Sequence, residues 1–248
     1  MDQKTALVLS GGGARGAYQV GVIQALSSLF DDWKIPHPFP IYTGVSAGAI
    51  NTSFMASHAD DFSNGAKQLV DLWSQLTSEQ VFRTDALSLG KIGFQWAREL
   101  SFGSITGSTP GKALLDTSPL RVLIEERLAL HKISRNIETK HLEALAITAM
   151  DYRDSTAVTF LETQNDEKSW VKPRKVSEPT KITVDHVMAS SAIPLLFPPV
   201  LASGRYFGDG CVRNTHPCSP AIYLGAQKLV IVGVRSQNTT ADPHRRLV

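Results

Sequence analysis

Two glycine-rich turns, each between a short apolar run and a helical pattern, most strongly limit what this chain can fold into. The first, SGGGARG (residues 10–16), follows the apolar run 6–9, and the second, GVSAG (residues 44–48), follows Ile41 and Tyr42. A strand that turns directly into a helix is a building unit of α/β folds. The sequence therefore predicts two such units in succession.

The rest of the chain continues to alternate strand and helix patterns. We expect strands at Ala6–Ser10, Glu143–Met150, Thr156–Thr163, Arg205–Phe207 and Lys228–Val234, and helices at Gly16–Leu29, from the second turn to about Ser57, and at Ala66–Leu76, Pro119–Leu130, Thr183–Ser191 and Pro220–Leu224. Ser118 is the expected N-cap of the helix that opens at Pro119. This order predicts an α/β sandwich.

We expect one domain over residues 1–248, with a core at about 5–235 and a disordered or truncated tail at 236–248. In two internal segments the apolar residues show no regular spacing. Asn165–Glu178 is polar and is expected to be a surface loop. Gln80–Gly111 mixes aromatic side chains with five glycines, which makes it the candidate for a mobile cap over a site.

Composition narrows the class of protein. Hydrophobic residues make up 42% of the chain, and 25 Lys and Arg against 23 Asp and Glu leave a net charge of +2, too balanced to indicate a nucleic-acid partner. Cys211 and Cys218 form neither a disulfide framework nor the spacing of a zinc site, and we expect no metal or other cofactor. No apolar run is long enough for a signal peptide or a membrane span, so we expect a cytoplasmic protein, although export without an N-terminal signal stays open.

Ser46 is the candidate nucleophile, because GVSAG has the G-x-S-x-G form of a nucleophile elbow. In such an elbow the serine lies on a sharp turn from strand to helix, and the flanking residues, here Gly44 and Gly48, must be small. The alternative is an ordinary serine in a flexible turn, since the pentapeptide alone is a weak signal.

The loop Gly11–Gly16 is a candidate anion site, because its backbone amides lie at the start of a helix. Gly11, Gly13 and Gly16 match the dinucleotide fingerprint, but its acidic residue is missing, since Asp31 and Asp32 lie in a loop instead of at the end of a strand. The other anion that would fit is the oxyanion of an acyl intermediate formed on Ser46. A non-catalytic module that binds a nucleotide or a lipid through this loop remains an alternative.

Two residues are candidates for the base that would activate Ser46. Asp209 follows the expected strand Arg205–Phe207 and precedes a glycine, so its carboxylate would lie at a strand end on a tight turn. Its ordinary pKa makes it a weak base unless the site excludes water. His216, in the loop that follows, would instead complete the chain order Ser46, Asp209, His216 of an α/β-hydrolase triad.

Three blocks in this order, GGGARG (11–16), GVSAG (44–48) and Asp209-Gly210, resemble the patatin-like phospholipases. The segment from Ala189 to Pro199 resembles the stretch that precedes the family's aspartate, and 219–226 resembles its following helix, so the resemblance covers about residues 5–235. One departure is Cys211, where the family usually has Gly or Ala, and we expect a thiol there to make the protein sensitive to alkylation.

The resemblance implies a three-layer α/β/α sandwich with a mostly parallel central sheet. It implies a lipid acyl hydrolase in which Ser46 is the nucleophile, Asp209 is the base, and the amides of Gly11, Gly12, Gly13, Ala14 and Arg15 form the oxyanion hole, with no metal and no histidine required. The expected substrate is a phospholipid or another acyl lipid. Transient contact with a membrane surface is then expected too.

Overall fold

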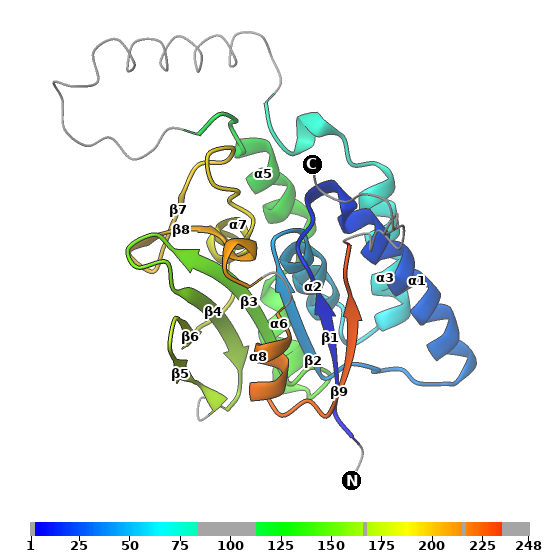
Figure 1. The fold of residues 1–248 in the computed structure, drawn as a ribbon. Coiled ribbons are helices and arrows are strands. Elements are labelled where there is room, and N and C mark those ends of the chain that lie inside the picture. The colour runs from blue at the N-terminus through cyan, green and yellow to red at the C-terminus, as the bar shows by residue number, and fades with distance from the viewer. Residues whose placement is uncertain (1–2, 84–112, 166–167, 215–216, 235–248) are drawn as a thin grey trace, which may run out of the picture.

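The computed structural model describes residues 3–83, 113–165, 168–214 and 217–234 (Figure 1). Most of the expected cap at Gln80–Gly111, the alternative base His216 and the tail 236–248 lie outside these residues.

A central sheet of mostly parallel strands, flanked by helices, forms the body of the fold, as the sequence predicts (Figure 1). Its main path runs β5-β6-β4-β3-β2-β1-β9, and β8 pairs with β3 and β7. The strands are β1 (Thr5–Leu9), β2 (Ile41–Val45), β3 (Ala144–Asp151), β4 (Ala157–Thr163), β5 (Val171–Lys172), β6 (Lys175–Pro179), β7 (Val200–Ala202), β8 (Arg205–Asp209) and β9 (Lys228–Val232). The four neighbours β9, β1, β2 and β3 all run in the same direction, so their carboxyl ends lie at one edge of the sheet.

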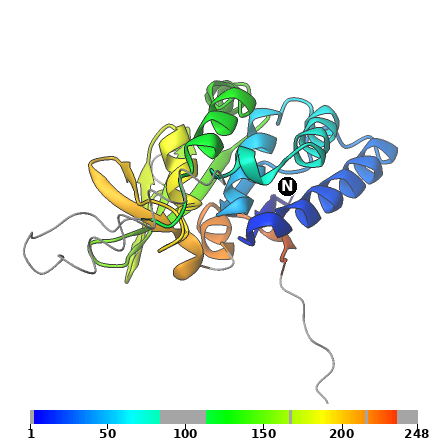
Figure 2. The same cartoon turned by 90° about the horizontal axis from the view of Figure 1, so that it is seen from above.

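Alternate side chains of the central strands enter two separate cores, which makes the sheet the middle of three layers. In β1, Leu7 and Leu9 join the larger core, whereas Ala6 and Val8 join the smaller one. This follows from the two-residue period of a strand that is covered on both faces. The larger core packs against most of the helices and the smaller one against α8, which lies on the other side of the sheet (Figure 2).

The described helices are α1 (Gly16–Asp32), α2 (Ala47–Ser57), α3 (Phe62–Ser74), α5 (Ser118–Arg127), α6 (His131–Glu138), α7 (Val184–Ser190) and α8 (Cys218–Tyr223). Among them, α2 is buried along almost its whole length, because Ala, Gly, Ser and Thr side chains allow neighbouring elements to approach on every side. None of the helices among the described residues combines the length and the apolar character needed to cross a membrane.

Three expectations about local structure are wrong. Asn165–Glu178 is not all loop, because it contains β5 and most of β6, which pair at the far end of the sheet. Ser118 is the first residue of α5 and does not cap it; Thr117 precedes the helix, and the Ser118 amide donates to the Asp116 carboxylate at 2.8 Å. Asp31 and Asp32, expected in a loop, are the last two residues of α1. The sequence reading also missed α6 and β7 altogether.

Candidate active site

Ser46 lies on a strained turn between β2 and α2. Its φ is 57° and its ψ is −129°, a backbone conformation that residues with a Cβ rarely adopt. Such a residue costs about 1–3 kcal/mol and persists only where the surroundings enforce it. The surroundings here are close-packed backbone: a Cβ on Gly44 would collide with Gly48, and a Cβ on Gly48 would lie 2.6 Å from the carbonyl oxygen of Ser10. At both flanking positions there is therefore room only for glycine.

The strand register brings Asp209 to Ser46. In the parallel ladder Val45, the last residue of β2, lies beside Thr148 of β3, and in the antiparallel ladder Asp209, the last residue of β8, lies beside Ala149. The opposite edge of β3 is paired with β4, so β8 continues along β3 where β2 leaves it. Ser46 and Asp209 meet at this point, each only 4% exposed.

Burial raises the pKa of Asp209 above its ordinary value of 3.8. Three hydrogen bonds to the carboxylate oppose this rise without cancelling it: one from the Ser46 hydroxyl, one from the Cys211 amide at 2.8 Å and one from the Cys211 thiol. A carboxylate with a raised pKa is a stronger base than an exposed aspartate. The arrangement can therefore accept a proton from Ser46 and return it.

The glycine loop lies directly against Ser46. A Cβ on Gly11 would be 2.9 Å from the Cβ of Ser46 and would collide with the sulfur of Cys211. Gly13 has a φ of 54° and opens a short 3-10 turn, Gly13–Arg15, that runs into α1. Within this turn the amide of Arg15 donates to the carbonyl of Gly12 at 3.1 Å, so it is already used. Of the amides expected to hold an oxyanion, those of Gly11 to Ala14 therefore remain the better candidates.

A buried polar network that the sequence reading missed holds both ends of this loop. The side-chain amide of Gln19 donates to the carbonyl of Ser10 at 2.6 Å, and that of Asn51 donates to the carbonyl of Gly16 at 3.2 Å. Asn51 also donates to Gln19 at 3.0 Å and accepts from the Trp73 indole at 2.7 Å. The sequence did carry a signal for this network, because Gln19 and Asn51 are polar residues on helix faces that otherwise enter the core.

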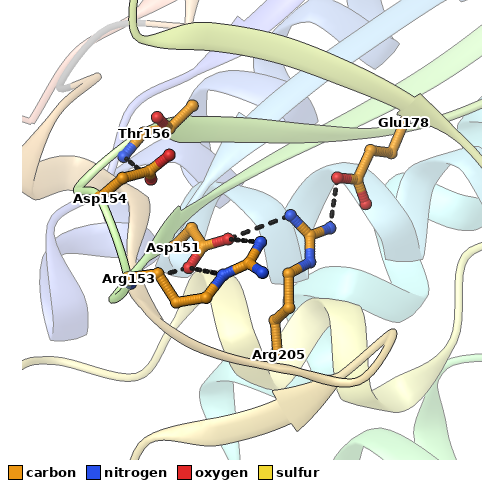
Figure 3. A network of polar contacts seen from close by, with 6 residues as sticks. All are labelled: Asp151, Arg153, Asp154, Thr156, Glu178 and Arg205. Carbon is orange, nitrogen blue, oxygen red and sulfur yellow. Dashed lines mark hydrogen bonds and ion pairs between the residues drawn. The ribbon is translucent and has the colours of Figure 1, made fainter.

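Charged side chains hold the start of β8, the strand that carries Asp209 (Figure 3). Arg205 forms an ion pair with Asp151 at the end of β3, 3.0 Å away, and another with Glu178 of β6. Burial alone would raise the pKa of Asp151, but its hydrogen bonds to Arg153 and the charges of Arg153 and Arg205 hold it below the ordinary value. The ion pairs thus join β8 to β3, with which it also shares backbone pairing, and to β6, with which it does not.

Other candidates for chemistry are not assembled in the described part of the chain. No three His, Cys, Asp or Glu side chains gather there in a way that could hold a metal ion. His216 lies outside this part of the chain. The side chain of Arg15 is exposed.

Several solved structures resemble this fold at low sequence identity. VipD from Legionella pneumophila is 17% identical, with 85% of this chain and 46% of that chain covered and a TM-score of 0.48. Human GIVD cytosolic phospholipase A2 in complex with methyl gamma-linolenyl fluorophosphonate is 12% identical, with 92% and 40% covered and a TM-score of 0.45. ExoU of Pseudomonas aeruginosa, in its complex with SpcU, is 18% identical, with 79% and 37% covered and a TM-score of 0.36. The chain spans less than half of each of these structures.

No curated protein matches the chain. A family model does match, and it extends from β1, through the glycine loop, the elbow at Ser46 and the turn at Asp209, to α8: its description is patatin-like phospholipase, and it covers residues 7–222. Because this match takes in most of the sequence, the chain belongs to the patatin-like phospholipase family.

Proposed function

We propose that the protein hydrolyses acyl esters of phospholipids or related lipids through an acyl-enzyme on Ser46, with Asp209 as general base. The observation that carries the proposal is that the strand registers bring Ser46, on a strained elbow, to the buried carboxylate of Asp209, whose pKa is raised by burial. Membership of a phospholipase family supports the lipid substrate.

In the first half-reaction the Ser46 oxygen would attack the ester carbonyl carbon while Asp209 takes the hydroxyl proton. The resulting oxyanion would face the amides of Gly11 to Ala14, whose loop abuts Ser46. Collapse of the intermediate breaks the bond to the alcohol, which leaves with the proton from Asp209. The fatty acyl group stays on Ser46.

The second half-reaction uses water in place of the alcohol. Asp209 takes a proton from the water as its oxygen attacks the acyl carbon, and the same amides hold the oxyanion. When the bond to Ser46 breaks, the proton returns from Asp209 to the serine oxygen and the fatty acid is released. One residue serves as base and acid in turn, so these steps use no histidine.

Exposed leucines near Asp209 fit an apolar substrate. The Asp209 amide donates to the carbonyl of Ala192 at 2.7 Å. Three and four residues further along the chain lie Leu195 and Leu196, whose carbonyls accept from the amides of Leu114 and Leu115. Leu195, Leu196 and Leu114 all rank among the exposed large hydrophobic side chains. Acyl chains bind by burying such surface, and transient contact with a membrane would present them.

Three variants test the proposal. Ser46→Ala and Asp209→Asn should each lower hydrolysis of a short-chain nitrophenyl ester by about 1,000-fold or more, and a fluorophosphonate should label the parent protein at Ser46. Retained activity in both variants would refute the Ser46–Asp209 pair. His216→Ala should be nearly silent; a loss comparable to that of Ser46→Ala would favour the histidine triad instead.

The non-catalytic alternative makes the opposite prediction for labelling. A protein that binds a nucleotide or lipid through the glycine loop would form no fluorophosphonate adduct at Ser46, and a dinucleotide would raise its melting temperature. If the label does form, product analysis after incubation with mixed phospholipid vesicles identifies the ester bond that is cleaved.

A further inference from the structure

Ser190, the last residue of α7, bonds to the backbone of the candidate nucleophile. Its hydroxyl oxygen accepts a hydrogen bond from the amide of Ser46 at 3.0 Å and donates one to the carbonyl of Thr148 in β3 at 2.7 Å. All three residues are buried. The hydroxyl thus links the elbow to the strand that lies beside both β2 and β8.

The Ser46 amide has particular need of this partner. It belongs to a residue whose φ of 57° turns the chain out of the β2 ladder, and a buried amide without a partner costs about 1–3 kcal/mol. Its use by Ser190 also means that this amide is not available to an oxyanion. The oxyanion donors must therefore come from other groups, which agrees with a role for the glycine loop.

The same short segment also contacts the candidate base. Two residues after Ser190, the carbonyl of Ala192 accepts from the amide of Asp209 at 2.7 Å. Close packing continues beyond Asp209, because a Cβ on Gly210 would collide with the carbonyl of Thr148, the group that Ser190 also binds. The end of α7 therefore lies where it can set the backbone of Ser46 relative to that of Asp209.

We propose that Ser190 is a positioning residue, which holds the Ser46 backbone in its strained conformation so that the serine hydroxyl faces Asp209. The proposal rests on the proposed function, in which that hydroxyl attacks the ester. Ser190 has no contact with substrate in this role. Small displacements of a reacting group cost up to about 100-fold in rate, so loss of this one hydroxyl should be visible in the chemical step.

Ser191 provides a matched control. It is the next residue and is also buried, but its hydroxyl has no hydrogen-bond partner among the residues that the structure describes. Ser191→Ala therefore removes the same hydroxyl oxygen from the same helix end, but it breaks no hydrogen bond to the residues that the structure describes. A general effect of altering this helix end would appear in both variants.

The experiment compares Ser190→Ala and Ser191→Ala with the parent by fluorophosphonate labelling and ester hydrolysis. For Ser190→Ala we expect a labelling rate and a kcat lower by about 10- to 100-fold, a KM within about twofold, and labelling that still goes to completion. Ser191→Ala should match the parent. A change that merely unfolds part of the protein would instead lower the final extent of labelling and leave the rate of the folded fraction unchanged.

Hydrogen exchange at the elbow provides a readout that does not depend on activity. The peptide containing Ser46 should exchange at least about tenfold faster in Ser190→Ala than in Ser191→Ala, because the Ser46 amide has lost its acceptor. Equal exchange in the two variants, or a Ser190→Ala labelling rate within twofold of the parent, would overturn the proposal. If the parent itself is not labelled, the proposed function fails, while the exchange comparison still decides whether Ser190 holds the elbow.

Discussion

Ser46, the proposed nucleophile, has a backbone conformation that suits glycine better. The strain of about 1–3 kcal/mol at a positive φ remains in any variant that keeps a Cβ. Ser46→Gly should therefore be more stable than Ser46→Ala by about 1 kcal/mol, since relief of strain exceeds the extra chain entropy that glycine loses on folding. Urea denaturation measures the difference. Equal stabilities would mean that the elbow imposes no strain on its central residue.

Asp209 should lower the stability of the folded protein at the neutral pH where, in the proposed function, it acts as a base. Its pKa is raised mainly by burial, so ionisation is less favourable in the folded state than in the unfolded state. Asp209→Asn, which keeps the size and an acceptor oxygen, should therefore melt at a higher temperature than the parent at pH 7. The advantage should shrink as the pH falls through the raised folded value towards the ordinary 3.8, and it should vanish below 3.8, where the parent carboxyl is neutral in both states.

Melting curves of both proteins between pH 4 and pH 8 check this prediction, with Asp154→Asn as a control at an exposed aspartate. A parent more stable than Asp209→Asn at pH 7 would contradict it, because it would mean that the hydrogen bonds from Ser46 and Cys211 outweigh burial. The same raised pKa should appear as the lower limit of the pH range of activity.

At the scale of elements, the glycine loop depends on α1, α2 and α3, which share the network of Gln19, Asn51 and Trp73. Asn51→Ala removes the side-chain hydrogen bonds to the Gly16 carbonyl, the Gln19 oxygen and the Trp73 indole, in a region that is buried or half-buried. We expect a loss of about 3 kcal/mol in the free energy of unfolding, measured by denaturation. Asn64→Ala, on the exposed side of α3, should change stability by less than about 0.5 kcal/mol. Comparable losses in the two variants would argue against the network.

Patterns along the sequence predicted those elements whose apolar and small side chains show which positions are buried. The strands β1, β2, β3 and β4 and the helices α1 and α2 carry apolar or small residues at the expected period, and the structure has them within a few residues of the predicted ranges. Strands β5 and β6 were missed because they lie at the end of the sheet, where backbone pairing needs no apolar pattern: both residues of β5 are exposed. Helix α6 was missed because its apolar face consists of only Ile133 and Ile137, and the residues between them are polar.

The candidate site was predictable as residues but not as an arrangement. The motifs singled out Ser46 and Asp209, and the resemblance paired them. Their proximity depends on β8 continuing along β3 where β2 ends, a pairing between segments more than fifty residues apart that leaves no local signal. For the same reason no local sequence pattern marks Ser190 or Gln19, which bind backbone atoms of Ser46 and Val232, far away in the chain.

At the scale of the whole molecule, the two buried aspartates of the β3–β8 ladder should respond to acid in opposite ways. Asp151 and Asp209 lie near opposite ends of this short ladder. The pKa of Asp151 is held low by its arginine partners, whereas that of Asp209 is raised by burial. Ionised Asp151 therefore stabilises the fold, whereas ionised Asp209 destabilises it. The stability of the parent at neutral pH includes both of these opposite contributions.

The contribution of Asp151 can be isolated with Asp151→Asn. At pH 7 the variant should lose about 3 kcal/mol of unfolding free energy, because Arg205 would keep only Glu178 and Arg153 would lose its charged partner beside the ladder (Figure 3). A lowered pKa stabilises the fold at pH values above the ordinary 3.8, and the effect disappears as the pH falls through the folded value. The parent and the variant should therefore converge in acid.

Asp154→Asn separates this effect from the loss of any carboxylate in the same turn, since Asp154 is exposed and bonds the amide of Thr156 at 2.9 Å. Its cost should stay below about 1 kcal/mol at every pH. If Asp151→Asn costs no more than this control, the ion pairs with Arg205 and Arg153 do not hold the ladder. If Asp151→Asn costs more than the control and also slows the labelling of Ser46, the strand that carries Asp209 depends on these charges for its position. The same ion pairs then support both the stability of the fold and the reactivity of the site.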